Sequence, residues 1–141
     1  MAETLQQWRR NGWLKPHKPS DSEISDLMEI VDRDLQDAQS DLSLDWKFGI
    51  AYNAVLKLCT ILLYLAGYKP ERNLAHYRTL QALPHLLPQY SADDADFLDA
   101  CRIRRNTAEY DLAGSTTQTE FEELYQFAQD LRTAVKAHLE P

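Results

Sequence analysis

Apolar side chains recur every three or four residues in several stretches of this chain, which is the spacing of one face of an α-helix. Such stretches cover residues 20–38, 72–87, 117–139 and a segment that begins at 91. Residues 43–66 are apolar on nearly all faces, as in a helix buried at the centre of a domain. No alternating pattern predicts a strand. The sequence therefore predicts an all-α, up-and-down bundle of four to five main helices.

Signals at the ends of these segments support the boundaries. Ser20, Ser91 and Thr117 each precede an acidic residue by three positions, which is the spacing of a capping box. Gly67 occupies the position of a left-handed C-cap, so the central helix should stop there. Pro84 should bend or restart the third helix. The fourth helix has a predicted apolar face of four residues: Phe97, Leu98, Cys101 and Ile103.

Residues 1–19 form a predicted N-terminal arm, which precedes a helical domain over residues 20–141. We expect a short helix and then an extended connector, because prolines 16 and 19 cannot lie inside a helix. Basic residues mixed with Trp8 and Trp13 are typical of RNA contacts. Two tryptophans near a terminus, however, favour an arm that is pinned on the core of its own domain. The arm contains four basic residues: Arg9, Arg10, Lys15 and Lys18.

Charge limits the partners that the whole molecule can attract. The 141 residues include 15 Lys and Arg against 22 Asp and Glu, a net charge of -7. Such a molecule repels nucleic acid and anionic membranes as a whole, so a local patch must hold any polyanion. Nine carboxylates lie between Asp21 and Asp45. We interpret them as a solvated helix face, because a hard cation needs ligands that converge.

Two patterns bear on location. The N-terminus has no apolar stretch before a small-residue cleavage site, which predicts a cytoplasmic protein. The window 48–68 has the length of a membrane span, but Asn53, Lys57 and Thr60 interrupt it. We therefore expect the central helix of a bundle and no membrane partner.

The sequence offers little metal or redox chemistry. Cys59 and Cys101 have neither Cys-x-x-Cys nor Cys-x-x-His spacing and are predicted to be buried free thiols. No Gly-rich phosphate loop is present in the sequence. We therefore predict neither a metal nor a cofactor.

The segment 102–111 is the densest positive patch outside the arm. Arg102, Arg105 and Asn106 share one helix face with Glu109, because positions three and four apart are neighbours. Their donors can form a fork that matches a phosphate, which indicates a binding site for phosphate or an RNA backbone. The alternative is an internal network, with Arg105 paired to Glu109 and Arg102 paired to a carboxylate of the first helix.

Several short motifs along most of the chain resemble the HEPN superfamily of small helical-bundle proteins. They are Gly12-Trp-Leu-Lys with Ile24 and Arg33-Asp34-Leu35, then Ala51-Tyr52-Asn53-Ala54, Ala66-Gly67-Tyr68-Lys69-Pro70, His76-Tyr77, and Arg104-Arg105-Asn106-Thr-Ala-Glu-Tyr110-Asp111. The chain is most similar to a stand-alone bacterial branch whose motif ends in Glu-Tyr-Asp. Many members are ribonucleases or toxins. The resemblance implies a homodimer that binds RNA, a nucleotide, or a partner protein such as a nucleotidyltransferase or an antitoxin.

Catalytic members carry Arg, a polar residue, three more positions and then His, and they cleave RNA without metal in a cleft completed by a second subunit. By this resemblance Arg105 takes the arginine place, Asn106 the polar place and Tyr110 the place of the histidine. A tyrosine with a pKa near 10 is only about a thousandth ionised at pH 7, so it is a poor general base. It can still donate a hydrogen bond to phosphate or stack on a base. Tyr52 and Asn53 are expected to line the same pocket.

His76 is the histidine best placed to replace the missing one. It lies at the basic start of the third helix, and if that end meets the arginine cluster, His76 and Arg105 would combine a base with a phosphate clamp. The alternative is a helix-terminal histidine bonded to backbone. The remaining histidines, His17, His85 and His138, have no suitable neighbour in the predicted arrangement.

Three functions follow from these alternatives. The leading interpretation is a HEPN-like module that binds RNA, a nucleotide or a partner protein through the Arg, Asn and Tyr pocket, without efficient cleavage. The runner-up is a metal-independent, toxin-like ribonuclease that uses Arg105 with His76 or with Tyr110. The third is a structural or interaction bundle with a degenerate site, in which Arg105 is buried against a carboxylate and Asn106 and Tyr110 tie down the loop at 111–116.

Overall fold

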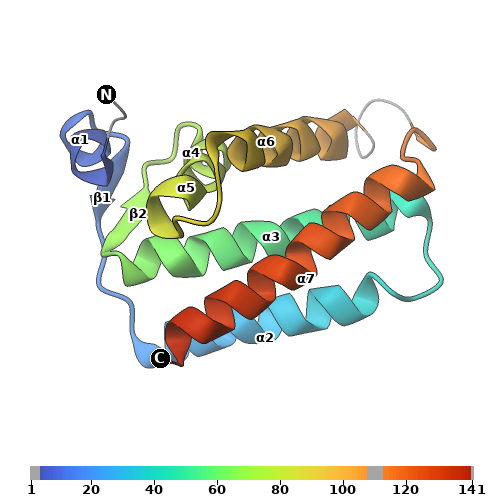
Figure 1. Ribbon diagram of the computed structural model, residues 1–141, viewed down its shortest axis with the longest axis horizontal. Coiled ribbons are helices and arrows are strands. Elements are labelled where there is room, and N and C mark those ends of the chain that lie inside the picture. The colour runs from blue at the N-terminus through green and yellow to red at the C-terminus, as the bar shows by residue number, and fades with distance from the viewer. Residues whose placement is uncertain (1–3, 108–112, 141) are drawn as a thin grey trace.

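The computed structural model describes residues 4–107 and 113–140 and confirms the all-α prediction (Figure 1). Short strands accompany the helices, and each strand has only three residues. Within the described ranges the elements follow in this order: α1 (Leu5–Arg10), β1 (Leu14–Pro16), α2 (Asp21–Asp37), α3 (Leu44–Leu65), β2 (Tyr68–Pro70), α4 (Ala75–Gln81), α5 (Leu83–Leu86), α6 (Ala92–Asn106) and α7 (Gln118–Leu139).

The four long helices form an up-and-down bundle. α2, α3, α6 and α7 run in alternating directions along the long axis, with α6 and α2 on opposite sides of α3 (Figure 1). α3 is the axis, because it packs most extensively against α2 and α7 and also contacts α4 and α6. Its side chains dominate the core, and Phe48, Tyr52, Leu58 and Ile61 are all 2 % exposed or less. The prediction of a central buried helix is therefore confirmed.

α3 is also the one helix among the described residues that is long and apolar enough to cross a membrane. However, 67 % of its most apolar window is buried inside the bundle. That burial is typical of the core helix of a globular domain, because a lipid-facing helix keeps its apolar surface outside.

Most predicted helix ends are confirmed. Ser91 and Thr117 form capping boxes with Asp94 and Glu120, and Gly67 has a φ of +94° at the end of α3. At the start of α2 the hydroxyl of Ser20 accepts a hydrogen bond from the amide of Glu23, at 3.1 Å. The Glu23 carboxylate contacts the His17 ring instead of the Ser20 amide. The prediction of a complete capping box there is wrong.

Two details of the third and fourth helices differ from prediction. The third helix begins at Ala75, three residues later than predicted, because Leu74 adopts a left-handed φ of +57°. It restarts as α5 near Pro84, as predicted. On α6, Ile103 is 53 % exposed, so its place on the apolar face is wrong. Position 103 lies about 140° around the helix from the buried Leu98.

The N-terminal arm is packed on the bundle, which confirms the predicted role of its tryptophans. Trp8 is 7 % exposed and contacts a small core cluster with Leu14, Leu63 and Ala82. The prediction of no strand is wrong, because β1 pairs antiparallel with β2 and places Lys15 opposite Lys69. Strands of three residues are too short to show an alternating pattern.

Both cysteines are buried free thiols, as predicted. Cys59 is fully buried on α3, and Cys101 is 6 % exposed on α6. Burial raises the pKa of each thiol to about 12. The two thiols therefore stay protonated and unreactive at neutral pH.

Candidate anion-binding site

Three helices bring together Tyr52, His76 and Arg105. Tyr52 is fully buried on α3, and the Cζ atom of Arg105, from α6, lies 5.5 Å from the centre of its ring. The ring of His76, in the first turn of α4, has its centre 6.5 Å from the centre of the Tyr52 ring. The start of the third helix thus meets the arginine cluster. We call Tyr52, His76, Arg102, Arg105 and Lys57 the central cluster.

The cluster holds His76 in its neutral form. Desolvation lowers the pKa of His76 below its usual value of 6.5, and the charges of Arg105, Lys57 and Arg102 lower it further. A neutral imidazole at pH 7 can accept a hydrogen bond or a proton. Lys57 was not predicted as a site residue, although it follows Asn53 by one helical turn and therefore shares its face.

Tyr52 contributes a neutral phenol to the cluster. Burial raises its pKa, and the nearby charges of Arg105 and Arg102 only partly oppose this effect. Its hydroxyl is buried and has no hydrogen-bond partner within residues 4–107 and 113–140. A core tyrosine is expected to have a polar partner. The Tyr52 ring contacts the guanidinium of Arg105 and the ring of His76.

The three neighbouring arginines of α6 point to different partners. Arg102 donates from Nε to Asp99 Oδ1 at 2.8 Å, and Asp99 lies one turn earlier on the same helix. The predicted alternative, in which Arg102 pairs with the first helix, is therefore wrong. Arg105 donates from Nη1 to the Asn106 side-chain oxygen at 3.3 Å. Arg104 lies on another face and contacts α7.

Asn53 and Tyr110 are the other two predicted site residues. Asn53 is half-buried on α3, and in the described parts of the chain no hydrogen bond joins it to the central cluster. Tyr110 lies outside the described residues, together with Glu109 and Asp111. Of the predicted motif, the structure therefore describes Arg105 and Asn106 but not Tyr110.

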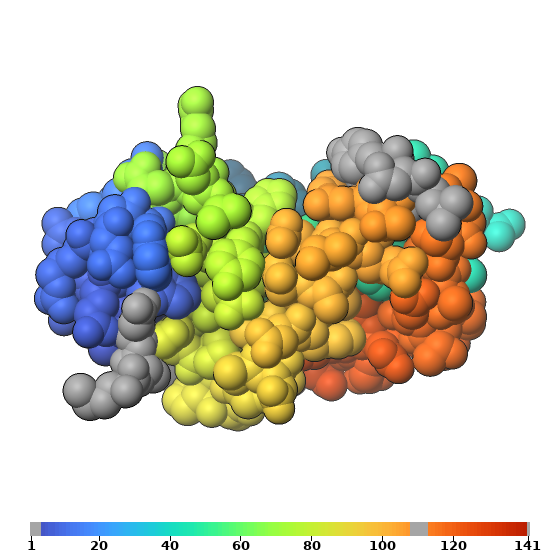
Figure 2. Space-filling model, turned by 90° about the horizontal axis from the view of Figure 1, so that it is seen from above, coloured from blue at the N-terminus to red at the C-terminus, as the bar shows by residue number. Residues whose placement is uncertain are grey.

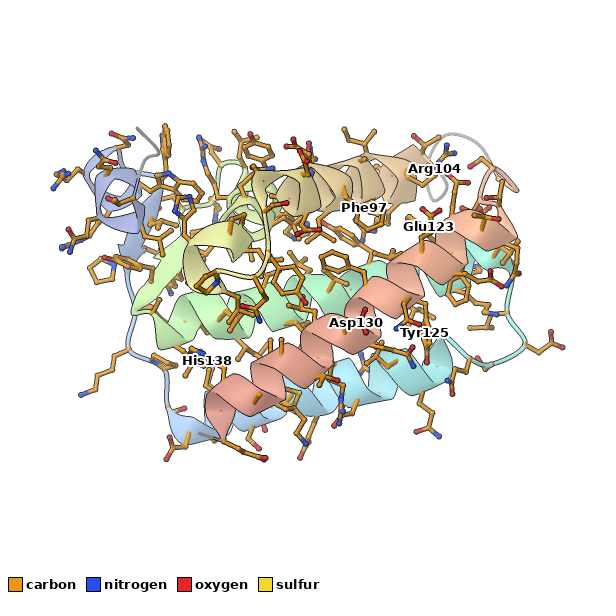
Figure 3. All side chains as sticks on the ribbon, in the orientation of Figure 1. Phe97, Arg104, Glu123, Tyr125, Asp130 and His138 are labelled. Atoms are coloured by element: carbon orange, nitrogen blue, oxygen red, sulfur yellow. The ribbon has the colours of Figure 1, made fainter. Side chains whose placement is uncertain are left out.

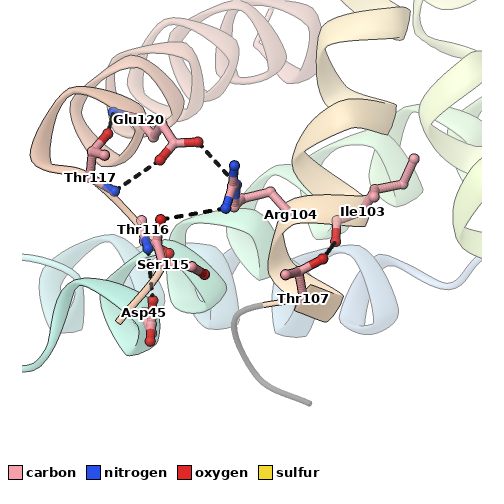
Figure 4. Close-up of polar contacts among 8 residues, drawn as sticks. All are labelled: Asp45, Ile103, Arg104, Thr107, Ser115, Thr116, Thr117 and Glu120. Atoms are coloured by element: carbon pink, nitrogen blue, oxygen red, sulfur yellow. Dashed lines mark hydrogen bonds and ion pairs between the residues drawn. The ribbon is translucent and has the colours of Figure 1, made fainter. Parts of the chain in front are cut away.

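Arg104 and Asp45 hold residues 114–116 and the start of α7 in place (Figure 4). Arg104 donates to Glu120 at 3.0 Å and to the carbonyl of Ser115 at 3.4 Å. Asp45, in the first turn of α3, accepts hydrogen bonds from the amides of Gly114 and Thr116 at 2.5 and 3.2 Å. The sequence did not predict these hydrogen bonds of Asp45, because Asp45 and Gly114 lie 69 residues apart.

A small cavity of about 220 Å³ lies beside Arg104, between α6 and α7. Phe97, Arg104 and Glu123 approach one another there (Figure 3). Glu120 and Glu123 both line the cavity, so it is less suited to an anion than the central cluster.

The remaining histidines lie away from the central cluster. His17 contacts Glu23 at 2.7 Å and packs on Tyr64, and neither neighbour supplies the positive charge that a phosphate needs. His85 packs edge-on against Trp8. His138 lies near the C-terminal end of α7, far along the bundle from Arg104 (Figure 3).

Comparisons with protein-family models, curated proteins and solved structures found no match for this chain. Among the described residues, no group of three or more His, Cys, Asp or Glu side chains is placed to hold a metal ion. The central cluster combines cationic side chains from α3 and α6 with a neutral imidazole and a neutral phenol. Its chemistry is that of an anion site with a potential proton acceptor.

Proposed function

We propose that this chain is a cytoplasmic, HEPN-like helical module that binds the phosphate of RNA or of a nucleotide at the central cluster. One observation carries the proposal. The Cζ atom of Arg105 lies 5.5 Å from the centre of the Tyr52 ring, which packs near His76, and the charges of Arg105, Lys57 and Arg102 act together on His76 in a protein whose net charge is -7. Like charges held together repel one another, and a bound anion relieves that repulsion.

Phosphate fits this arrangement better than a carboxylate or a halide. A guanidinium presents parallel donors that match two phosphate oxygens, and Lys57 supplies a point charge. The imidazole of His76 can stack on a base, whereas the ring of Tyr52 is fully buried. RNA or a nucleotide therefore uses both the charges of the cluster and the ring of His76.

Binding without efficient cleavage is the function that we favour. Tyr110 occupies the motif position of the catalytic histidine, and a phenol is a poor general base at pH 7. Asp99 also neutralises part of the charge of Arg102. Both features weaken the stabilisation of a transition state more than the binding of a ground-state phosphate.

A metal-independent ribonuclease is the second candidate, and the neutral state of His76 supports it. His76 would take the proton of a 2′-hydroxyl while that oxygen attacks the adjacent phosphorus. The bond to the 5′-oxygen breaks, the leaving oxygen takes up a proton from water, and a cyclic phosphate remains. Arg105 would stabilise the charge on the phosphoryl oxygens.

The homodimer and a partner protein, such as a nucleotidyltransferase or an antitoxin, are proposals that rest on the resemblance alone. A symmetric dimer would place two central clusters on one particle. Light scattering at high protein concentration tests the homodimer proposal, because a monomeric mass would refute it. The binding proposal does not depend on its result.

Binding of labelled RNA in the presence of a chelator tests the function, with Arg105→Ala as the variant. Arg132→Ala is the matched control, because it also removes one arginine, from an ion pair with Asp32 on the far side of the bundle. We expect Arg105→Ala to bind the RNA more weakly than the native protein does, and Arg132→Ala to keep the native affinity. Equal binding by both variants would overturn the proposal.

Two further outcomes of the same experiment decide between the alternatives. Cyclic-phosphate products that disappear in both Arg105→Ala and His76→Ala would establish the ribonuclease. A fall in melting temperature of Arg105→Ala, with no RNA binding by the native protein, would support the structural bundle instead.

A further inference from the structure

The basic residues of this acidic protein are concentrated at one end of the chain's fold. The segments 1–19 and 67–81 contain seven Lys and Arg and two carboxylates, a net charge of +5. The rest of the chain contains eight Lys and Arg and twenty carboxylates, a net charge of -12. Charge separation of this kind creates a local field that attracts a polyanion even when the whole molecule repels it.

The structure places these two segments together. β1 pairs with β2, and the arm and the β2–α4 segment lie side by side at one end of the molecule (Figure 2). Two neighbouring grooves of about 430 and 350 Å³ lie on these segments and share Glu71 and Arg72, so one carboxylate lies among the basic residues. Trp13 and Arg78 line the larger groove, and Lys15 and Lys69 line the smaller one. We call the two together the basic groove.

Two lysines of the groove are held in a mutually repulsive position. Lys15 and Lys69 are direct cross-strand partners, so their side chains leave the same face of the sheet. Like charges directly opposite each other destabilise a strand pair. Within the described chain, no carboxylate forms an ion pair with Lys15, Lys69 or Arg72. A bound anion between the lysines would remove this repulsion.

Flat side chains line the groove together with the charged ones. The Cζ atom of Arg78 lies 3.7 Å from the centre of the Trp13 ring, and Tyr64 lines the smaller groove beside Lys69. Proteins that hold single strands combine a positively charged groove with planar groups on which bases stack. A concave, polar surface suits a flexible strand better than it suits the plane of a membrane.

We propose that the basic groove binds single-stranded nucleic acid, as a contact surface separate from the central cluster. Lys15, Lys69 and Arg72 hold phosphates, and Tyr64 and the Arg78–Trp13 pair offer stacking surfaces. Ala75 lines the smaller groove, and His76 of the central cluster is the next residue along the chain. Binding in the groove does not require the central cluster.

Lys69→Glu tests the proposal, with binding measured by the fluorescence anisotropy of a labelled single-stranded oligouridine over a series of salt concentrations. Loss of one phosphate contact weakens binding about fourfold at ~0.15 M salt and reduces the salt slope by about 0.7. Lys69→Glu also replaces the repulsive cross-strand pair with an attractive one. We expect its melting temperature to stay the same or rise, so that weaker binding cannot be attributed to unfolding.

Lys136→Glu is the matched control, because it makes the same charge change in the last turn of α7, outside the groove. We expect it to keep most of the affinity. Equal loss in the two variants would overturn the proposal, as would binding of phosphatidylserine vesicles without binding of the oligouridine.

Arg105→Ala separates this inference from the proposed function. If both sites act, Arg105→Ala retains part of the affinity, and adding Lys69→Glu removes the remainder. If Arg105→Ala alone abolishes binding and Lys69→Glu changes nothing, the basic groove is refuted while the central cluster stands. If Arg105→Ala has no effect and Lys69→Glu still weakens binding, the groove stands without the central cluster.

Discussion

Tyr52 is a residue whose hydroxyl works against the stability of the core. The hydroxyl is buried and has no hydrogen-bond partner in the described structure. An unsatisfied buried polar group costs on the order of 1 kcal/mol or more. We therefore predict that Tyr52→Phe raises the free energy of unfolding by about 1 kcal/mol, measured by urea denaturation. A decrease would show that the hydroxyl has a partner in solution and would contradict the prediction.

His76 reports the charges around it through its titration. Its pKa is lowered first by desolvation and then by Arg105, Lys57 and Arg102. The unfolded chain therefore takes up the proton first, so stability should fall as the pH drops through 6.5 and level off below the folded pKa. Observed by NMR, the pKa of His76 should lie below 6.5 and rise when inorganic phosphate binds.

Arg105→Ala gives the control for this titration. Because desolvation is the larger cause, removal of the arginine should raise the pKa of His76 only part of the way toward 6.5. The response to phosphate should become smaller in the same variant. A pKa that is identical in both proteins would place Arg105 too far away to act on His76.

Sequence reasoning predicted the members of the central cluster better than their contacts. Helical spacing places Arg102 and Arg105 on one face of α6, and this holds within a single helix. It does not identify partners on other helices, which depend on how the helices cross. Arg102 was expected to pair with a carboxylate of the first helix, but it pairs with Asp99 on its own helix. Lys57 was not recognised as a neighbour of His76.

At the scale of elements, one carboxylate joins α3 to the chain before α7. Asp45 accepts one hydrogen bond from the amide of Gly114. It accepts another from the amide of Thr116, which is drawn in Figure 4. Because the site is solvent-accessible, we predict a loss of about 1 kcal/mol in the free energy of unfolding of Asp45→Asn at pH 7. The amide oxygen of asparagine still accepts a hydrogen bond but has no negative charge.

The dependence of this loss on pH provides its control. The backbone hydrogen bond from Gly114 and the hydrogen bonds from Thr116 hold the pKa of Asp45 below 3.8. The unfolded chain protonates first as the pH falls, so the stabilisation is complete above 3.8 and lost through the folded pKa. Native protein and Asp45→Asn should therefore converge at low pH. A constant difference would mean that the carboxylate charge is not the cause.

Long elements were predictable from the sequence, and short ones were not. α3 and α7 each have 22 residues, so their apolar pattern and caps repeat often enough to define them. β1 and β2 have three residues each, and they pair across a separation of more than fifty residues. Their pairing depends on how the arm packs against the bundle, and a local sequence pattern does not predict that packing.

At the scale of the whole molecule, the arm packs against the bundle, and we expect the two to unfold together. Trp8 packs against Leu63 at the end of α3 and against Ala82 between α4 and α5. β1 adds backbone hydrogen bonds to β2, and the amide of Glu71 donates to the carbonyl of Trp13 at 2.9 Å. The arm also supplies Lys15 and Trp13 to the basic groove. Loss of the arm should therefore affect folding and nucleic-acid binding together.

Trp8 and Trp46 offer a matched pair of substitutions that tests this cooperativity. Trp8 is 7 % exposed in the arm, whereas Trp46 is 63 % exposed on α3. Trp8→Ala should lower the free energy of unfolding by about 3 kcal/mol, because it removes a large buried side chain. Trp46→Ala should change it by less than about 0.5 kcal/mol.

If the arm is one unit with the bundle, tryptophan fluorescence and far-ultraviolet circular dichroism should report the same urea midpoint in each protein. An earlier fluorescence transition in the native protein, with Trp8→Ala leaving the helical transition unchanged, would show instead that the arm unfolds by itself.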